Sequence, residues 1–358
     1  MARLPLKHEP QSICLLRLSA IGDISHSLPI LRSIQAHWPK TKISWIIGRT
    51  EYSLVQDIED IDFIVFDKRL GWQAYRKLHR ALQGRRFDVL LHMQMSLRAS
   101  LISLLVKSPI KLGFAKPVAK DFQWLFTNHK TTYKKQQHVI DSFFGFSEAL
   151  GVMEHVLRWE IPVPPAAQMF ADKYLDSNKR ILVISPCSSM AYRNWNAVGY
   201  ARVADYAIST HGMQVVLCGG PSNIEQQYRD HIIANMTQQP VDLIGKTSLK
   251  ELLAILNKAD VLIAPDSGPA HLATAVSTPV IGLYATTNPD RARPYLSAEY
   301  TVNRYPEAVQ DKYATPIEAL PWGIRVRDAG TMDRITIEEV IGMLDKFMQT
   351  TAPLEKLT

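Results

Sequence analysis

One polar stretch directly after the first apolar run holds a carboxylate in a position that suits catalysis. The run Ile13–Leu18 is followed by Ser19–His26, and then by Leu28–His37, which has helical periodicity. Gly22 permits tight backbone geometry, and Asp23 is expected at the carboxyl end of a strand, beside the N-terminus of a helix. That position suits a catalytic carboxylate. A simple helix cap remains an alternative for Asp23.

The strongest local signal in the sequence is the polar cluster at 264–271, which follows a short apolar run and opens a segment of small residues. Ser267, Gly268 and the amides after them can cradle phosphate oxygens, and Asp266 can accept hydrogen bonds from sugar hydroxyls. A capped turn with Pro269 at the first helical position is the alternative. The cluster is denser than capping requires, which favours a ligand site.

A third polar stretch leaves an apolar run at Ser185 and reaches Arg193 just before a predicted helix. Ser188 and Ser189 supply hydroxyls, and Arg193 supplies a guanidinium near free helix amides, which are the groups that bind a diphosphate. An ordinary polar turn has the same composition, so both readings stay open.

A basic and aromatic segment spans residues 114–138. Its basic members are Lys116, Lys120, Lys130, Lys134, Lys135 and His138, and its aromatic members are Phe114, Phe122, Trp124, Phe126 and Tyr133. Such a segment suits nucleic acid, an anionic sugar or a phosphorylated lipid headgroup at a membrane surface. A solvated helix face is the alternative.

Familiar catalytic and metal-binding patterns are absent or broken. Gly245–Thr247 follows a strand-like run, but the earlier glycine that a P-loop needs is replaced by Pro240. No GxGxxG, HExxH or GxSxG occurs, which removes the usual sequence evidence for a dinucleotide oxidoreductase, a zincin or a serine hydrolase. Asp60–Asp62 precedes the run Phe63–Phe66 and is predicted to be a solvated turn. We predict no obligatory metal.

Composition narrows the class of protein and its location. The chain has 358 residues, 46% hydrophobic and 21% charged, as in an ordinary globular protein of about two domains. Its apolar runs are too short to cross a bilayer, and the first residues lack a signal-peptide pattern, so we expect a cytosolic protein. The net charge of +7 favours anionic partners but is too diffuse to favour nucleic acid. Cys14, Cys187 and Cys218 are predicted to be buried thiols.

Two series of strand-like runs must position these polar stretches. Each run is followed by a loop and a helical stretch, which is the βαβ alternation typical of parallel α/β sheets. The expected strands are 13–18, 43–47, 63–66 and 89–92, then 181–185, 215–218, 241–244, 261–264 and 279–284. Helices are expected at 197–209, 224–236 and 249–257, with capping boxes at Ser248–Glu251 and Thr336–Glu339.

Proline spacing sets the expected domain boundary. The run Ile161–Pro165 contains three prolines and is the best linker candidate, so we predict domains at 1–163 and 164–358. The C-terminal helix is expected to pack back on the first domain. In parallel sheets, ligands bind at the carboxyl ends of strands, so two doubly wound Rossmann-like lobes facing across a cleft would present all three polar stretches.

Together these motifs resemble glycosyltransferase family 9, the ADP-heptose:lipopolysaccharide heptosyltransferases. Leu18–Asp23 with Leu28–Pro29 is similar to the first loop of the family, and 265–272 is similar to its second-lobe signature. The segments 125–128 and 135–138 look more like the subgroup that adds the first heptose to Kdo, as in heptosyltransferase I. The resemblance covers most of the chain.

The resemblance implies a GT-B fold, with acceptor binding in the first domain and nucleotide-sugar binding in the second. It places Asp23 at the position of the catalytic base. The implied donor-binding residues are Ser188, Ser189, Arg193, Asp266, Ser267, Gly268, Pro269 and His271. Acceptor binding is assigned to Gly22, Arg98, Lys116, Lys120, Lys135 and His138, the basic ones by charge and position.

The implied reaction is an inverting, metal-independent transfer of L-glycero-D-manno-heptose from ADP-heptose to a Kdo residue of the lipid A inner core. ADP-heptose is a co-substrate, and no cofactor is expected. The expected partners are the Kdo-lipid A acceptor and the anionic cytoplasmic face of the inner membrane, with peripheral association and no nucleic acid. Lys250 stands where some relatives have an acidic ribose contact, which leaves the nucleotide-base contacts open.

Other functions fit parts of the same pattern. A heptosyltransferase that adds the second heptose is one alternative within the same family. A nucleotide-sugar epimerase would share the phosphate loop but would need no basic acceptor surface. A two-lobed solute-binding protein is the non-enzyme alternative, although such proteins usually carry an export signal.

Overall fold

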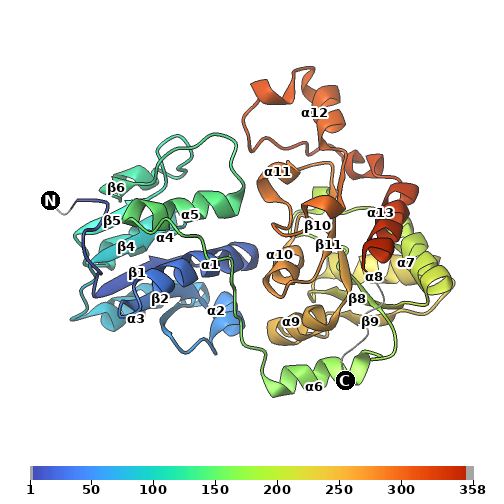
Figure 1. Ribbon diagram of the computed structural model, residues 1–358, viewed down its shortest axis with the longest axis horizontal. Helices are drawn as coiled ribbons and strands as arrows, with labels where there is room; N and C mark the ends of the chain where they lie inside the picture. The colour runs from blue at the N-terminus through green and yellow to red at the C-terminus, as the bar shows by residue number, and fades with distance from the viewer. Residues whose placement is uncertain (1–2, 352–358) are drawn as a thin grey trace. The chain divides into compact units, whose positions relative to one another are not determined.

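The computed structural model describes residues 3–351 and shows two α/β units, Met1–Pro162 and Val163–Thr358 (Figure 1). Their junction lies inside the proline-containing run at 161–165, as expected from the missing amide donors of proline. Each unit contains one six-stranded parallel sheet with helices on both faces. The predicted pair of doubly wound Rossmann-like sheets is therefore confirmed.

The first unit has the strand order β3-β2-β1-β4-β5-β6. Its strands are β1 (Ser12–Leu16), β2 (Lys42–Gly48), β3 (Ile61–Phe66), β4 (Val89–His92), β5 (Ile110–Gly113) and β6 (His129–Lys130). Its helices are α1 (Ile21–His37), α2 (Arg49–Val55), α3 (Trp72–Leu82), α4 (Leu97–Leu105) and α5 (Val139–Leu150), with short 3-10 turns η1 (Lys68–Leu70) and η2 (Gln123–Leu125). Helix α1 packs on α5, and α3 packs on α4, so the central strands are covered by helices on both faces.

The second unit has the strand order β12-β11-β10-β7-β8-β9. Its strands are β7 (Ile181–Ile184), β8 (Gln214–Gly219), β9 (Val241–Ile244), β10 (Val261–Pro265), β11 (Val280–Tyr284) and β12 (Thr301–Asn303). Its helices are α6 (Pro165–Tyr174), α7 (Ala197–His211), α8 (Asn223–Asn235), α9 (Leu249–Lys258), α10 (Gly268–Ala275), α11 (Pro289–Ala292), α12 (Tyr305–Tyr313) and α13 (Ile337–Thr350). Further 3-10 turns are η3 (Ala191–Arg193), η4 (Ala298–Tyr300), η5 (Ile317–Ala319) and η6 (Thr331–Arg334).

Both predicted capping boxes are present, at the starts of α9 and α13. Helix α13 buries Val340, Leu344 and Phe347 in the core of the second unit, together with residues of α7 and β8. The expectation that this helix packs back on the first unit is wrong for its apolar face, because that face completes the second core.

Two local expectations need correction. The stretch Ser19–His26 is not a loop throughout, because α1 begins at Ile21 and keeps Pro29 in its interior. The hydroxyls of Ser25 and Ser33 donate to backbone carbonyls inside this helix. Asp62 lies within β3 and not in a turn before it. Its carboxylate accepts a hydrogen bond from Ser44 of β2 and pairs with Arg85.

Candidate functional site

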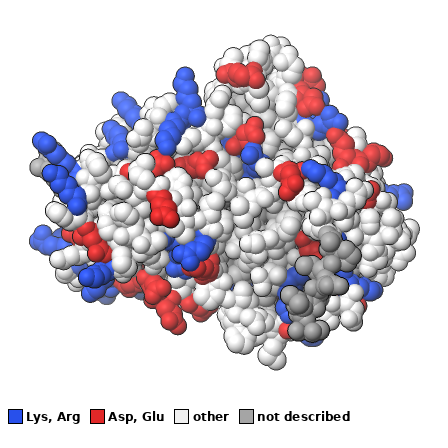
Figure 2. Space-filling view, in the orientation of Figure 1, with Lys and Arg blue, Asp and Glu red and all other residues white. Residues whose placement is uncertain are grey.

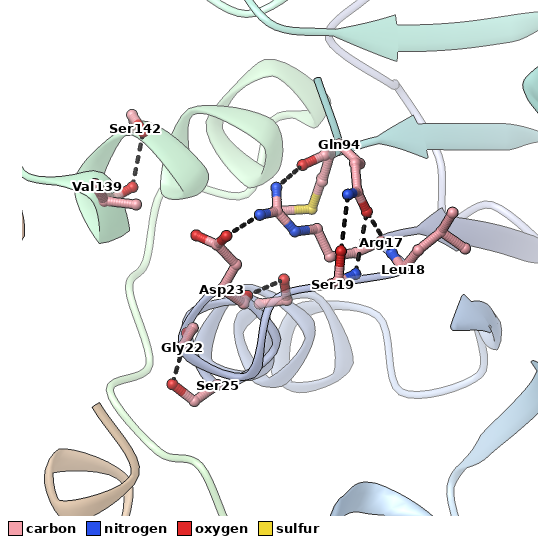
Figure 3. Close-up of polar contacts among 11 residues, drawn as sticks. Arg17, Leu18, Ser19, Gly22, Asp23, Ser25, Gln94, Val139 and Ser142 are labelled. Carbon is pink, nitrogen blue, oxygen red and sulfur yellow. Dashed lines mark hydrogen bonds and ion pairs between the residues drawn. The ribbon is translucent and has the colours of Figure 1, made fainter. Parts of the chain in front are cut away.

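The first candidate site lies at the carboxyl end of β1, where Asp23 occupies the first turn of α1. Its carboxylate forms an ion pair with Arg17, which leaves β1 and is almost fully buried. Figure 3 shows the two side chains pointing toward one another. The Asp23 side chain keeps 33% of its surface exposed, against 8% for Arg17. The carboxylate is therefore the accessible member of the pair.

The buried Arg17 guanidinium is fixed on two further sides. It donates to the carbonyl of Met93, after β4, and its Cζ lies 5.4 Å from the ring centroid of Phe143 in α5. An arginine cannot give up its proton in a protein, so it remains a cation that orients Asp23. The sequence showed Arg17 only as an interruption of an apolar run, and that interruption was the available signal.

Gln94 holds the backbone between β1 and α1. Its Oε1 accepts from the amides of Leu18 at 2.6 Å and Ser19 at 3.1 Å, and its Nε2 donates to the Ser19 hydroxyl at 3.2 Å (Figure 3). On the opposite side, the Gly48 amide donates to the Leu18 carbonyl at 3.1 Å. A Cβ at Gly48 would stand 2.4 Å from that oxygen, so the approach requires glycine. Sequence reasoning missed both residues.

A buried histidine connects the loop after β4 to η2. Gln123 Nε2 lies 3.2 Å from His92 Nδ1 and donates to the carbonyls of His92 and Gln94, while Ser100 Oγ of α4 lies 3.4 Å from His92 Nε2. Burial lowers the pKa of His92 to about 4, so the ring is neutral at neutral pH. This network orders the backbone that carries Gln94.

The predicted acceptor residues lie after neighbouring strands of the first sheet. Gly22 is in the first turn of α1, Arg98 is in the first turn of α4, Lys116 and Lys120 follow β5, and Lys135 and His138 follow β6. Because β1, β4, β5 and β6 are parallel neighbours, these residues share the carboxyl edge of the sheet.

Their side chains differ in accessibility. Arg98, Lys120 and Lys135 are exposed, and Lys116 is exposed with its Nζ 5.8 Å from the Trp124 ring centroid. His138 is buried and caps α5, accepting from the Ile140 amide at 3.2 Å. That geometry gives His138 a structural role as a helix cap.

The second candidate site lies at the carboxyl ends of β7 and β10. Arg193, in η3, places one guanidinium nitrogen 3.1 Å from Asp266 Oδ2 and 3.2 Å from the Asp266 carbonyl oxygen. Both side chains are nearly buried, at 13% and 12% exposed, and His271 Nε2 lies 3.9 Å from Asp266 Oδ1. The structure thus brings into contact two residues that lie far apart in the sequence and that were both predicted to bind the sugar nucleotide.

The start of α10 offers unsatisfied donors beside this ion pair. Ser267 is the N-cap, but its hydroxyl caps no amide and is buried without a hydrogen-bond partner within residues 3–351. Gly268 opens the helix, and Pro269 stands second, one place later than its expected first helical position. A buried hydroxyl without a partner is costly unless a ligand satisfies it. The helix start can therefore bind an anion.

The Arg193 loop is closed on itself and anchored in the core. The Ser188 amide donates to Asn194 Oδ1 at 2.7 Å, while Ser189 is exposed. Trp195 is fully buried and donates to the Ile335 carbonyl at 3.0 Å. Burial raises the pKa of the Cys187 thiol to about 12, so this thiol is not a nucleophile at neutral pH.

One cation near this loop was not predicted. The guanidinium carbons of Arg193 and Arg327 each lie 5.7 Å from the ring centroid of Tyr192. Arg327 is exposed and lies close to the bridge that pairs Arg325 with Thr287, after β11. The placement of both guanidinium groups near Tyr192 depends on the tertiary fold and could not be predicted from the sequence.

The described residues form neither a cluster of metal ligands nor a membrane-spanning helix. No three His, Cys, Asp or Glu side chains in that range come together as a metal site requires. Across the same part of the chain, no helix combines the length and hydropathy of a membrane span.

Comparison with known proteins places this geometry in context. The model of "Glycosyltransferase family 9 (heptosyltransferase)" matches residues 75–318. The lipopolysaccharide core heptosyltransferase OpsX of Haemophilus influenzae is 40% identical over 344 residues, covering 96% of this chain and 99% of that protein.

Solved structures share the fold. A glycosyl transferase family 9 protein from Veillonella parvula superimposes with a TM-score of 0.80 at 20% identity, over 97% of this chain and 99% of that one. The ADP-heptose lps heptosyltransferase II of E. coli gives a TM-score of 0.73 at 19% identity, over 95% and 99%. These matches confirm the predicted GT-B architecture.

Proposed function

The chain belongs to glycosyltransferase family 9, the heptosyltransferases, and we propose that it transfers L-glycero-D-manno-heptose from ADP-heptose to a Kdo residue of the lipid A inner core. This proposal is supported by one feature in each unit. The first unit holds a partly exposed Asp23 carboxylate, and the second holds a cation beside an unsatisfied helix start. The Haemophilus relative, named as a lipopolysaccharide core enzyme, supports the substrate class.

Asp23 has the chemistry of a general base in this proposal. Its carboxylate accepts the proton of the acceptor hydroxyl as that oxygen attacks the anomeric carbon of the heptose. The bond from the anomeric carbon to the diphosphate oxygen breaks, and ADP leaves with the electron pair. A single displacement inverts the anomeric carbon. Arg17 holds the carboxylate in place and cannot compete for the proton.

The second site has the chemistry to stabilise the leaving ADP. Negative charge that develops on the diphosphate is met by Arg193, by the Ser267 hydroxyl and by the amides that open α10. Ser188 and Ser189 extend this polar surface, and Asp266 and His271 are proposed to contact the heptose hydroxyls. These groups supply the positive charge that the step needs, so we propose that the transfer requires neither a metal nor a cofactor.

The proposed place of action follows from the acceptor. Kdo-lipid A is a lipid, so the reaction is proposed to occur at the cytoplasmic face of the inner membrane, with peripheral attachment. The exposed cations Arg98, Lys116, Lys120 and Lys135 support binding of an anionic acceptor at the carboxyl edge of the first sheet.

The alternatives divide by product. Membership of a transferase family removes the solute-binding protein as a reading of the whole chain, whereas second-heptose transfer differs only in acceptor. The test offers ADP-heptose with Kdo-lipid A, with heptosyl-Kdo-lipid A, or alone, and measures products by mass spectrometry. If the proposal is correct, one heptose is added to Kdo-lipid A, and neither of the other two reactions gives a product. A product only with the heptosylated acceptor would establish second-heptose transfer, and an altered sugar nucleotide without acceptor would establish epimerisation.

A further inference from the structure

Helix α4 presents an apolar face to solvent. Leu97, Leu101 and Leu104 are 55%, 43% and 60% exposed, although the same helix buries Ala99 and Ile102 completely. Residues spaced by four and three positions lie on one side of a helix, so the three leucines form a continuous stripe. The helix is thus apolar on both its core side and its outer side.

The 3-10 turn η2 adds apolar side chains beside α4. Phe122 and Leu125, on either side of Gln123 and Trp124, are 62% and 70% exposed. The Gln123 side chain and Ser100 of α4 contact opposite nitrogens of the same buried imidazole, His92, which brings η2 and α4 together. We name Leu97, Leu101, Leu104, Phe122 and Leu125 the apolar surface.

Positive charge is concentrated in the stretch of sequence that carries this apolar surface, although Lys134 pairs with Glu148 and Lys111 donates to the Ser103 carbonyl. Residues 89–140 contain eight Lys and Arg but one acidic residue, Asp121, and so carry the +7 net charge of the entire chain. The rest of the chain therefore has equal numbers of acidic and basic residues. The eight are Arg98, Lys107, Lys111, Lys116, Lys120, Lys130, Lys134 and Lys135. Figure 2 shows Lys and Arg side chains projecting from the margin of the first unit that carries β6 in Figure 1.

We propose that the apolar surface inserts into the headgroup region of a lipid bilayer that carries anionic lipids, with the surrounding cations on the lipid phosphates. Exposed leucine and phenylalanine side chains gain free energy when the bilayer removes them from water, and each nearby Lys or Arg is attracted to anionic headgroups. A second copy of the chain is a poor occupant, because its equal positive charge would face this one. This inference rests on the proposed peripheral attachment and assigns it to a defined surface, and it does not depend on which sugar is transferred.

Insertion can be followed at a single position, because the native thiols are out of reach. Cys14, Cys187 and Cys218 are all buried. A Leu104→Cys variant therefore carries one accessible thiol for a polarity-sensitive fluorophore. The matched control is Met169→Cys on α6 of the second unit, where the native side chain is 71% exposed.

The two labelled proteins are mixed with vesicles of phosphatidylglycerol and phosphatidylcholine. The label at position 104 is expected to shift to the blue and brighten on binding, and the label at position 169 is expected to stay unchanged. Equal responses at both positions, or no response at position 104 when the protein has bound, would overturn the proposal. A shift at position 104 that follows protein concentration without vesicles would show self-association and would also overturn it.

A sedimentation assay separates the apolar contribution from the charge. Replacing Leu97, Leu101 and Leu104 together with serine is expected to weaken vesicle binding by at least about tenfold. The matched control replaces Met169, Ile224 and Leu296 with serine, since these side chains are also exposed, and is expected to change nothing. Equal binding of the leucine variant and the wild type would overturn the proposal.

Charge is tested with Lys116→Gln and Lys120→Gln. Each lysine is expected to contribute about fivefold to binding of anionic vesicles at low salt, falling as salt is raised. ADP affinity is measured in every variant as a check on the second unit and is expected to remain unchanged. Because vesicle binding is read without acceptor or donor, failure here leaves the proposed transfer standing, and failure of the transfer leaves this inference standing.

Discussion

The two candidate sites both pair an arginine with an aspartate at the carboxyl end of a parallel strand, yet they expose different chemistry. In the first unit the arginine is buried and the carboxylate of Asp23 is 33% exposed. In the second unit Arg193 and Asp266 are equally buried, and the feature left unsatisfied is the Ser267 hydroxyl at a helix start. The first site therefore offers a proton acceptor, whereas the second offers hydrogen-bond donors and positive charge.

This difference shows that the ion pair alone does not define the function of a site. The same two residue types orient a base when the cation is buried among Met93, Phe143 and the carboxylate. They prepare an anion site when the pair lies beside free helix amides. The chemistry depends on which group is left accessible or unsatisfied at each site, the Asp23 carboxylate in the first and the Ser267 hydroxyl in the second.

The largest effect on transfer is expected from Asp23→Asn. The amide keeps the shape and can still accept a hydrogen bond from Arg17, but it is no longer a base. Transfer is expected to fall by about 100 to 10,000-fold with donor affinity unchanged. Transfer rates and a calorimetric titration with ADP-heptose measure the two quantities. A loss below about tenfold would reduce Asp23 to a structural residue of the first helical turn.

The second site is tested by Arg193→Ala beside Asp266→Ala. Arg193 should matter for ADP and for ADP-heptose, because a charge-assisted hydrogen bond to phosphate is worth about 1.5–3 kcal/mol, or roughly tenfold or more. Asp266 should matter mainly when the heptose is present. Calorimetry with both ligands checks this.

The ion pair found between Arg193 and Asp266 couples these two effects. The double variant should therefore lose less ADP-heptose affinity than the two single losses combined. Strict additivity, or an equal loss for both ligands in both single variants, would contradict the assigned roles.

A smaller effect is expected from Arg17→Lys. Lysine keeps the positive charge but cannot hold the Met93 carbonyl and Asp23 with one planar group. We expect kcat to fall by about tenfold while KM for ADP-heptose stays the same, because Arg17 acts through Asp23 in the first unit. Steady-state kinetics against ADP-heptose distinguish this from a donor-binding defect, which would raise KM instead.

The sequence predicted the sheets well because their strands are apolar runs bounded by polar turns. Val89–His92 and Val241–Ile244 were predicted to the residue. Strands β5, β6 and β12 were missed because they are short and contain lysine, histidine or asparagine, which give no apolar run. The start of α1 was placed too late, since Gly22 and the serines before Pro29 looked like a loop.

Some residues of both sites could be predicted from the sequence, but the residues that they contact could not. Asp23 and Ser267 follow strands directly, so their position at a sheet edge followed from topology. The contact of Arg193 with Asp266 spans 73 positions, and Gln94 reaches Leu18 across 76. Such contacts depend on strand order, which one sequence does not contain.

The smallest expected effect is on the acid stability of the first unit, which contains His92. Burial lowers the pKa of His92 to about 4, against 6.5 for an unperturbed histidine. Between these values the unfolded chain binds a proton that the folded chain excludes, so the stability contributed by neutral His92 is present above about pH 6.5 and is lost as pH falls toward 4. His92→Gln should lose less stability than the wild type between pH 7 and pH 5.

Hydrogen exchange measured separately in the two units checks this last expectation. The difference between variant and wild type should appear in amides of β4 and its neighbours, because His92 links β4 to Gln123 and Ser100. Amides of β7 and β10 should exchange alike in both proteins, since His92 and the side chains of Gln123 and Ser100 that contact it all belong to the first unit. If wild type and variant respond equally to acid in β4, the His92 network does not hold the Gln94 backbone, and the rigidity of the Asp23 site must come from Arg17 and Gly48 alone.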